Sequence, residues 1–209
     1  MIIASYSDLL AEVVSYLERP DLAAAVPGFV QRAEARFNRR LRTRDMEALT
    51  TLPETGALPA DFLEWIFLTW TGGGRIQAPR YVEADSPEFR YKHRPHGDPQ
   101  YFALIAGRIQ VRPARPGSLD LAYYQAVPAL GATRASNWLL ARNADLYLYA
   151  ALAEAHLFQK DEARAREWTK MADDLMAGLM GQADSQKTGR RPTRAAADVA
   201  EVTAANAPA

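Results

Sequence analysis

Apolar residues recur every three or four positions in the first part of the chain, and this spacing predicts two amphipathic helices. The first helix begins at Ser5 or Ser7, because either side chain can accept a hydrogen bond from the first turn, and it runs to about Leu17. The second helix begins after Pro27, a residue that suits a first helical turn, and fades by Ala48. Together they predict a helical hairpin.

The middle of the chain has short runs rich in β-branched and aromatic residues, which Gly and Pro interrupt. This composition predicts strands. The short turn at Ala106 and Gly107 predicts a hairpin, and loops of this length cannot carry parallel crossovers. We therefore expect an antiparallel meander. Its main strands are Leu63–Trp70, Tyr101–Ile105, Arg108–Arg112 and Leu119–Gln125.

Helical spacing returns in the last third of the chain. A short turn at Trp138–Ala141 leads to a helix that Asn143 caps, and apolar residues on several sides of this helix predict that it is buried. Asp161 caps the next helix, which ends near Gly181. Residues 182–209 have few large apolar side chains, so we expect an arm with no stable structure of its own.

These elements predict an α+β fold, with a four-helix-type bundle of two helical hairpins, an inserted antiparallel β-sheet and an extended C-terminal arm. The expected segments are the first hairpin at 1–48, the β region at 49–130, the second hairpin at 131–181 and a docking arm at 182–209.

Composition narrows the possible functions. The 209 residues are 48% hydrophobic and 24% charged, as in an ordinary globular protein. No apolar run approaches the roughly 20 residues that cross a bilayer, so no membrane partner is expected. The absence of cysteine excludes a disulfide framework, a cysteine-based zinc site and thiol catalysis.

Local charge is uneven although lysine plus arginine balance aspartate plus glutamate at 25 each. Between Gln31 and Arg44 there are six arginines and a single acid, Glu34. This arginine stretch is either a solvated helix face or a binding surface for acidic groups or nucleic acid.

Candidate chemistry is sparse. His93 and His96 lie three residues apart, but no third ligand with recognised spacing accompanies them, and His156 is expected to be a satisfied buried or interface imidazole. The run Gly72–Gly74 lacks the Lys and Ser or Thr of a phosphate-binding loop and predicts a hairpin tip. No catalytic, cofactor-binding or metal-binding residue is therefore predicted.

Four segments in order along the chain carry a resemblance to a known family. They are Tyr6–Glu47, Ala57–Trp65, Leu121–Leu130 and Ala135–Leu175. The chain resembles the head-to-tail adaptor (connector) proteins of short-tailed bacteriophages and related prophages. It departs from the family pattern at Asn143, where a His-Pro-Asp-like helix start is expected, and Asn can still cap that helix.

The resemblance implies a structural protein of the virion neck that is assembled in the cytoplasm of the bacterial host. Its partners would be further copies in a ring of about twelve, the portal protein, and the tail nozzle or other tail proteins. DNA would pass through the channel during ejection without sequence-specific binding. The family is not enzymatic and implies no cofactor.

Two other functions remain open on the residues alone. One is a nucleic-acid-binding packaging accessory protein that uses the arginine stretch, and the other is a cell-wall hydrolase carried in the particle. If the chain is an adaptor, its arginines should pair with carboxylates of a neighbouring subunit or of the portal. The expected interface residues are Arg36, Arg39, Arg40, Arg42, Arg190, Arg191 and Arg194.

Overall fold

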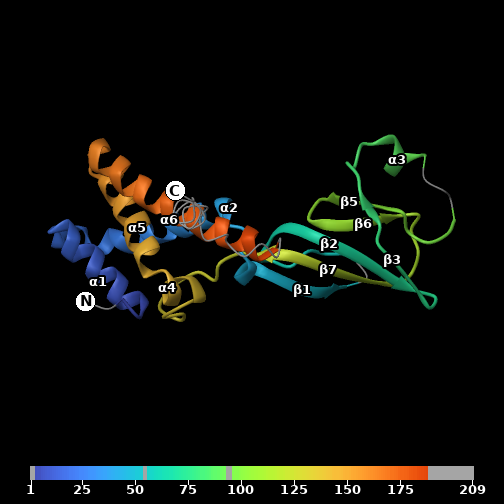
Figure 1. Cartoon of the computed structure of the whole chain (residues 1–209), viewed down its shortest axis with the longest axis horizontal. Helices are drawn as coiled ribbons and strands as arrows, with labels where there is room; N and C mark the ends of the chain where they lie inside the picture. Colours follow the sequence, from blue (N-terminus) through green and yellow to red (C-terminus); the bar gives the residue numbers. More distant parts are fainter. Residues whose placement is uncertain (1–2, 54–55, 93–95, 188–209) are drawn as a thin grey trace, which may run out of the picture. The chain divides into compact units, whose positions relative to one another are not determined.

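The structure is a computed structural model that describes residues 3–53, 56–92 and 96–187 (Figure 1). It contains both helices and sheets, segregated along the chain, so the predicted α+β class is confirmed. Two compact units can be distinguished. The described residues of Met1–Ala33, Arg40–Thr43 and Leu140–Ala209 form the helical unit, and those of Glu34–Arg39 and Arg44–Leu139 form the β unit.

The described residues form six α-helices and two short 3-10 helices. They are α1 (Tyr6–Leu17), η1 (Pro20–Ala25), α2 (Val26–Arg40), η2 (Arg44–Met46), α3 (Pro87–Arg90), α4 (Trp138–Arg142), α5 (Ala144–Phe158) and α6 (Glu162–Lys187). They also form seven strands. These are β1 (Glu47–Leu52), β2 (Phe62–Gly72), β3 (Arg75–Gln77), β4 (Arg80–Tyr81), β5 (Tyr101–Ile105), β6 (Arg108–Arg112) and β7 (Ser118–Gln125).

Helix α1 begins where its sequence predicts. The Ser5 hydroxyl accepts a hydrogen bond from the Asp8 backbone N–H at 3.2 Å, and the Asp8 carboxylate accepts one from the Ser5 N–H at 2.9 Å. This reciprocal capping box satisfies backbone donors that the helix itself leaves unpaired. The hydrogen bond from Ser5 also lowers the pKa of Asp8. The predicted cap at Ser5 is confirmed.

Helix α5 is the buried centre of the helical unit. Nine of its 15 residues are buried, as the apolar residues on several of its sides predict. It packs against α1 and α6. Asn143 occupies the predicted N-cap position, but its side chain makes no capping hydrogen bond, so that part of the prediction is wrong. The arrangement of the helices as two hairpins of a four-helix bundle stays a prediction.

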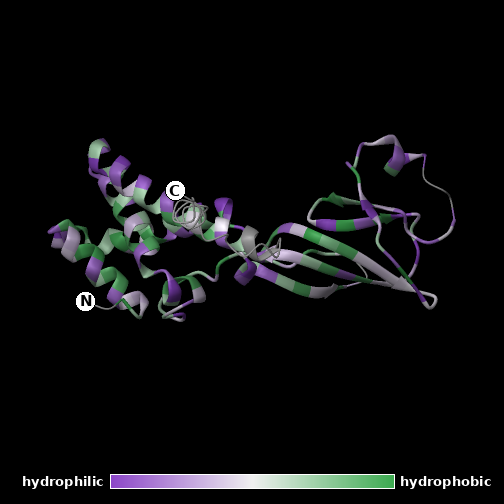
Figure 2. Ribbon diagram, in the orientation of Figure 1, coloured by the Kyte–Doolittle hydropathy of each residue, from purple (hydrophilic) through white to green (hydrophobic). Residues whose placement is uncertain are grey.

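Helix α6 is longer than its sequence predicts. Asp161 caps it as expected, since its carboxylate accepts from the Arg164 N–H at 3.2 Å. The helix then continues past Gly181 to Lys187, so the first six residues of the predicted arm are helical. Ala183 is buried, which explains the extension because the packed side of the helix reaches beyond the glycine. Hydrophilic and hydrophobic turns alternate along α6 (Figure 2).

The strands of the β unit form two sheets and not a meander. Sheet A has four strands in the order β1-β7-β2-β3, and sheet B has three in the order β4-β5-β6. Strand β7 pairs with both β1 and β2, although it follows them by a long stretch of sequence, and β4 pairs with β5 in parallel. The predicted β5–β6 hairpin is confirmed. The predicted meander was wrong. Short loops show only which strands are neighbours in the sequence, and they do not determine which distant strands pair.

Strand β1 was missed by the sequence prediction, which continued the second helix to Ala48. Helix α2 ends at Arg40, and β1 begins at Glu47. All six residues of β1 pair in regular antiparallel register with β7, and Leu52 is buried in the core of the β unit. Long-range pairing with β7 therefore overrides the local preference of these residues.

Strand β2 contains two β-bulges opposite β7. The register shifts between Phe62 and Glu64 and again between Trp65 and Phe67. Each bulge inserts one extra residue, so a strict alternation of faces does not hold along this strand. The residues that face the core are consequently spaced by three, three and two positions. They are Phe62, Trp65, Leu68 and Trp70.

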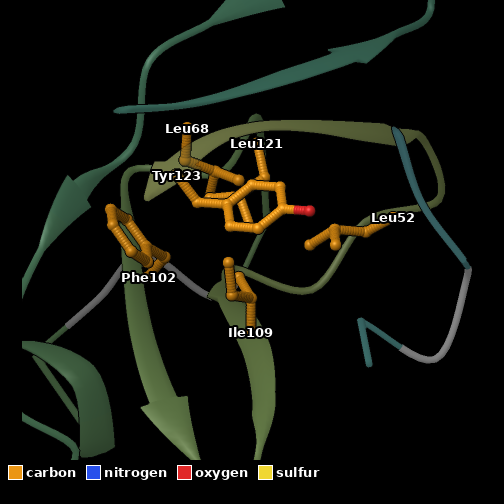
Figure 3. Close-up of a cluster of buried hydrophobic side chains, with 6 residues drawn as sticks. All are labelled: Leu52, Leu68, Phe102, Ile109, Leu121 and Tyr123. Atoms are coloured by element: carbon orange, nitrogen blue, oxygen red, sulfur yellow. The ribbon is translucent and has the colours of Figure 1, made fainter. Parts of the chain in front are cut away.

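The two sheets share one hydrophobic core (Figure 3). Sheet A contributes Leu68 and Leu121, which are 3% and 0% exposed, and sheet B contributes Phe102 and Ile109, which are 1% and 3% exposed. The Tyr123 ring lies in the same cluster, and its hydroxyl lies 3.1 Å from the Asp61 carboxylate, to which it donates. Aromatic contacts extend the core outward, with the Trp65 ring 5.1 Å from the Phe102 ring. We call this side of sheet A its inner face.

Two glycines accommodate the fully buried Trp70 indole. A Cβ on Gly72 or Gly117 would overlap the ring, so neither position admits a side chain without displacement. The β2–β3 hairpin closes beyond them through Gly73 and Gly74, both with positive φ, as a two-residue turn of this kind requires. The predicted hairpin tip at Gly72–Gly74 is confirmed.

Candidate functional site

The arginine stretch is divided between contacts inside the chain and exposure. In the helical unit, the Arg32 guanidinium lies 5.1 Å from the centroid of the Phe29 ring and donates through Nε to Glu154 at 3.1 Å. Arg40 donates to the Asp173 carboxylate at 2.6 Å. Both ion pairs are partly solvated, so each contributes at most about 1 kcal/mol to stability. Part of the stretch therefore joins α2 to α5 and α6.

The other predicted interface arginines of this stretch differ in exposure. Arg36 and Arg42 are half-buried and make polar or ring contacts within the chain, among them a 2.6 Å hydrogen bond from Arg42 to the Leu41 carbonyl. Arg39 is exposed, and it makes no hydrogen bond or ion pair with any residue that the structure describes. Arg39 is the member of the set whose charge is most available to another molecule.

The single acid of the stretch has a role that the sequence prediction missed. Glu34 is 5% exposed, and its carboxylate accepts a hydrogen bond from the Leu130 backbone N–H at 2.8 Å. One turn later, the Asn38 side chain accepts from the Val127 N–H at 2.8 Å. These bonds fix the segment that follows β7, because its backbone donors have no strand partner there. The sequence did contain a signal for this role. Glu34 is the lone acid among the arginines, and it lies one helical turn from Asn38.

Sheet A also presents apolar side chains on its outer face, away from the core. Leu49 of β1 and Phe67 of β2 lie opposite the same residue of β7, Ala122. Leu49 is 75% exposed and Phe67 is 50% exposed. We call Leu49, Ala122 and Phe67 the outer row. The small Ala122 leaves a hollow of about 520 Å³ between the two larger side chains, which Arg44, Glu47 and Ile66 also line.

Polar residues border the outer row along the strands. On one side, Asp120 of β7 lies opposite both Thr51 and Thr69, and the Thr51 hydroxyl donates to its carboxylate at 2.6 Å. On the other side, Tyr124 lies opposite both Glu47 and Glu64. An apolar centre with a polar rim is the usual composition of a protein-binding surface.

A charged cluster lies where the β2–β3 hairpin meets the loop before β7. Asp98 pairs with Arg75 at 3.2 Å and also with Arg115. The Arg115 guanidinium in turn lies 5.5 Å from the Trp70 ring centroid. Asp98 lies in the segment before β5, so the cluster joins three segments of the β unit. The shared carboxylate is largely buried, with 14% of its side chain exposed.

His156 is buried near the end of α5, as predicted, but it is not satisfied. Its Nδ1 has no hydrogen-bond partner and lies 3.9 Å from the Asp161 carboxylate. Burial lowers the pKa of His156, and the opposing effect of Asp161 is smaller. Burial thus favours the neutral form of the imidazole.

The remaining candidate positions do not form a site in the described part of the chain. His96 is exposed, and His93 lies outside the described residues. In residues 3–53, 56–92 and 96–187, no three His, Cys, Asp or Glu side chains lie together as metal ligands would. No helix in these same ranges is both long and apolar enough to span a bilayer. The predicted arm residues Arg190, Arg191 and Arg194 also lie outside the described residues.

Comparison with known proteins identifies the family. Among curated proteins none matches this chain. The family model described as SU10 adaptor protein matches residues 4–197. The match runs through both compact units, and it confirms the resemblance to phage head-to-tail adaptors that four separate segments carry. Such adaptors are structural components of the virion that interact with other head and tail proteins. The chain therefore belongs to the SU10 adaptor protein family, a family of structural phage adaptors.

Proposed function

We propose that the chain forms a ring of about twelve copies between the portal and the tail nozzle, and that this ring lines the channel for DNA during ejection. The observation that supports this function is the family match over residues 4–197, which includes the helices and both sheets. The adaptor assignment thus concerns nearly the whole chain and not one motif. No catalytic step is part of the proposal.

A closed ring needs two different surfaces on each subunit, because head-to-tail packing brings unlike patches together. Docking onto a portal needs a third. We assign the portal or neighbour contact to four arginines of α2 and the turn after it, together with the arginines of the C-terminal arm. These are Arg36, Arg39, Arg40 and Arg42, and Arg190, Arg191 and Arg194.

The exposed guanidinium of Arg39 gives this assignment its sharpest test. Arg40 is already paired with Asp173, so its reversal would disturb the chain itself. Arg39 has no such partner among the described residues, so Arg39→Glu removes an external contact without breaking an internal one. Reversal of one charge at a paired interface should weaken portal binding by about tenfold or more.

The experiment mixes the chain with the portal protein of the same phage and counts bound copies by mass photometry and electron microscopy. Arg108→Glu is the matched control, because Arg108 is equally an exposed arginine but lies at the β5–β6 turn of the β unit. We expect rings with the wild type and the control, and few or none with Arg39→Glu.

Two results would contradict the proposal. If the wild-type chain does not associate with the portal at all, the ring function is wrong. If Arg39→Glu assembles normally but binds DNA more weakly, with a strong dependence on salt, the packaging accessory function is supported instead.

The arm can be tested separately by truncation. Because α6 continues to Lys187 and Ala183 is buried, the chain should be cut after Lys187 and not after Gly181. We expect the truncated protein to melt at an unchanged temperature and to bind portal at least about tenfold more weakly. Equal binding by both lengths would show that the arm is dispensable.

A further inference from the structure

Strand β1 is an edge whose sole charged residue is Glu47, at its first position, and which lacks the other usual protections against pairing. In the described part of the chain its sole strand partner is β7, so one side of its backbone has no partner strand. Natural edge strands are commonly very short, bulged, or marked by lysine or proline. Strand β1 has six residues in unbroken register, with no proline and no basic residue.

The other strands of the same sheet show the protection that β1 lacks. Strand β3, at the opposite edge, is three residues long and begins with Arg75. Strand β2, which β3 covers only from Trp70 to Gly72, carries both bulges. A long, regular edge with so little protection indicates a backbone that another strand covers.

The sequence of β1 is complementary to itself in one antiparallel register. If Leu49 of one copy lies opposite Leu49 of a second copy, then Glu47 lies opposite Thr51 and Ala48 opposite Thr50. No like charges meet across the pair, and leucine meets leucine in its centre. The two-fold axis is perpendicular to the sheet, so the two outer rows join into one continuous apolar row.

We propose that β1 pairs with β1 of a second copy, antiparallel and centred on Leu49, so that the unassembled protein is a two-fold dimer. This inference rests on the geometry of the β unit and not on the ring function. A two-fold dimer does not propagate into a ring, so it must open when subunits assemble. The pairing would therefore cover the backbone edge of β1 and bring the Leu49 side chains of the two copies into contact until assembly begins.

Cross-linking tests the pairing directly, because the chain has no cysteine of its own. Residues directly opposite in antiparallel strands have Cα atoms about 4.5–5.5 Å apart, which a disulfide or a short bis-maleimide can bridge. Ile76→Cys is the matched control for Leu49→Cys. Leu49 is 75% exposed and Ile76 is 72% exposed, and they lie on opposite edges of the same sheet.

We expect Leu49→Cys to give a covalent dimer under oxidation, and Ile76→Cys to remain largely monomeric on a denaturing gel. Equal cross-linking of the two variants, or none in either, would overturn the proposal. Leu49 is exposed, so its replacement leaves the fold intact.

Sedimentation velocity over a range of concentrations gives an independent reading. The wild type should show a reversible monomer–dimer equilibrium, since one strand pair is a small interface. Leu49→Glu places two carboxylates face to face and should raise the dimer dissociation constant at least about tenfold, whereas Ile76→Glu should not. A monomeric wild type whose Leu49→Glu variant loses portal binding would assign the edge to the portal and overturn the two-fold dimer. Failure to assemble on the portal, with the dimer present, would instead count against the ring alone.

Discussion

The two faces of sheet A are built from the same strands, yet their apolar side chains have different surroundings. On the inner face, Leu68 and Leu121 are at most 3% exposed and pack against sheet B. On the outer face, Leu49 and Phe67 are at least half exposed. Burial of apolar area stabilises a fold by about 25 cal/mol per Å², and most of the area of Leu49 and Phe67 gains nothing from it in a single chain.

This difference links the inner face of the sheet to the stability of the chain and its outer face to association with other molecules. Neighbouring residues of β7 alternate between the two faces, so Leu121 points into the core and Ala122 belongs to the outer row. A substitution can therefore act on one property and spare the other.

The first comparison makes the same change on both faces. Leu121→Ala should lower the free energy of unfolding by about 3 kcal/mol, because Leu121 is fully buried and the change leaves a cavity. Leu49→Ala should change it by less than about 0.5 kcal/mol, because Leu49 is mostly exposed. Chemical denaturation measures both values. Similar losses in the two variants would mean that the outer face is also part of the core.

The second prediction probes close packing on the inner face. Gly117→Ala should cost about 2 kcal/mol, because the added methyl group would overlap the Trp70 indole. Gly131→Ala is the control, since a Cβ at Gly131 meets nothing within 4 Å. The intrinsic fluorescence of the four tryptophans and a thermal melt should change in the first variant and not in the second. A neutral Gly117→Ala would mean that the indole has room to move.

The third prediction concerns a buried hydroxyl and its dependence on pH. Tyr123→Phe removes the hydrogen bond to Asp61 and should cost about 1 kcal/mol near neutral pH. Burial, helped by the Asp61 charge, raises the pKa of Tyr123. A raised pKa means that the folded protein binds the phenol proton more tightly than the unfolded chain does. This contribution is complete below the unfolded pKa of about 10 and is lost as pH rises toward the folded value.

The pH dependence of stability distinguishes a raised pKa of Tyr123 from the mere loss of a hydrogen bond. Between pH 9 and 11 the free energy of unfolding should fall more steeply in the wild type than in Tyr123→Phe. Parallel curves for the two proteins would contradict a raised pKa for Tyr123.

The smallest expected effect is on the polar border of the outer row. Thr51→Val removes the hydrogen bond to Asp120, which is exposed, and should change stability by less than about 0.5 kcal/mol. Differential scanning calorimetry is sensitive enough to set this limit. A loss above about 1 kcal/mol would show that this border is stabilising in the single chain.

The helices were predictable because their signals are local. Ser5 caps α1 through residues three positions away, and the apolar residues of α5 predict its burial without knowledge of its partners. Strand β1 was not predictable in this way, because only β7, far along the sequence, provides its hydrogen bonds. The strand order of sheet A was not predictable for the same reason, because it also depends on long-range pairing with β7.

The candidate site was predictable only in part. The arginine stretch is evident in the sequence, but the sequence does not say that Arg40 pairs with Asp173 while Arg39 stays exposed. That distinction depends on where α6 places Asp173 in the folded chain. The outer row was missed because its members come from three strands, and neither Leu49 nor Phe67 is unusual alone.

The two bulges of β2 constrain how this strand can change in length during evolution. From Phe62 to Thr71 it uses ten residues to match the eight residues of β7 from Ser118 to Gln125, so two are supernumerary. Deleting either one at its bulge would restore simple alternation there and keep every remaining side chain on its present face. Deleting a residue from the regular stretch between Phe67 and Thr71 would instead turn the residues before it to the opposite face, because side chains alternate with a period of two. Relatives of this protein should therefore gain or lose residues of β2 at the two bulges and not between Phe67 and Thr71.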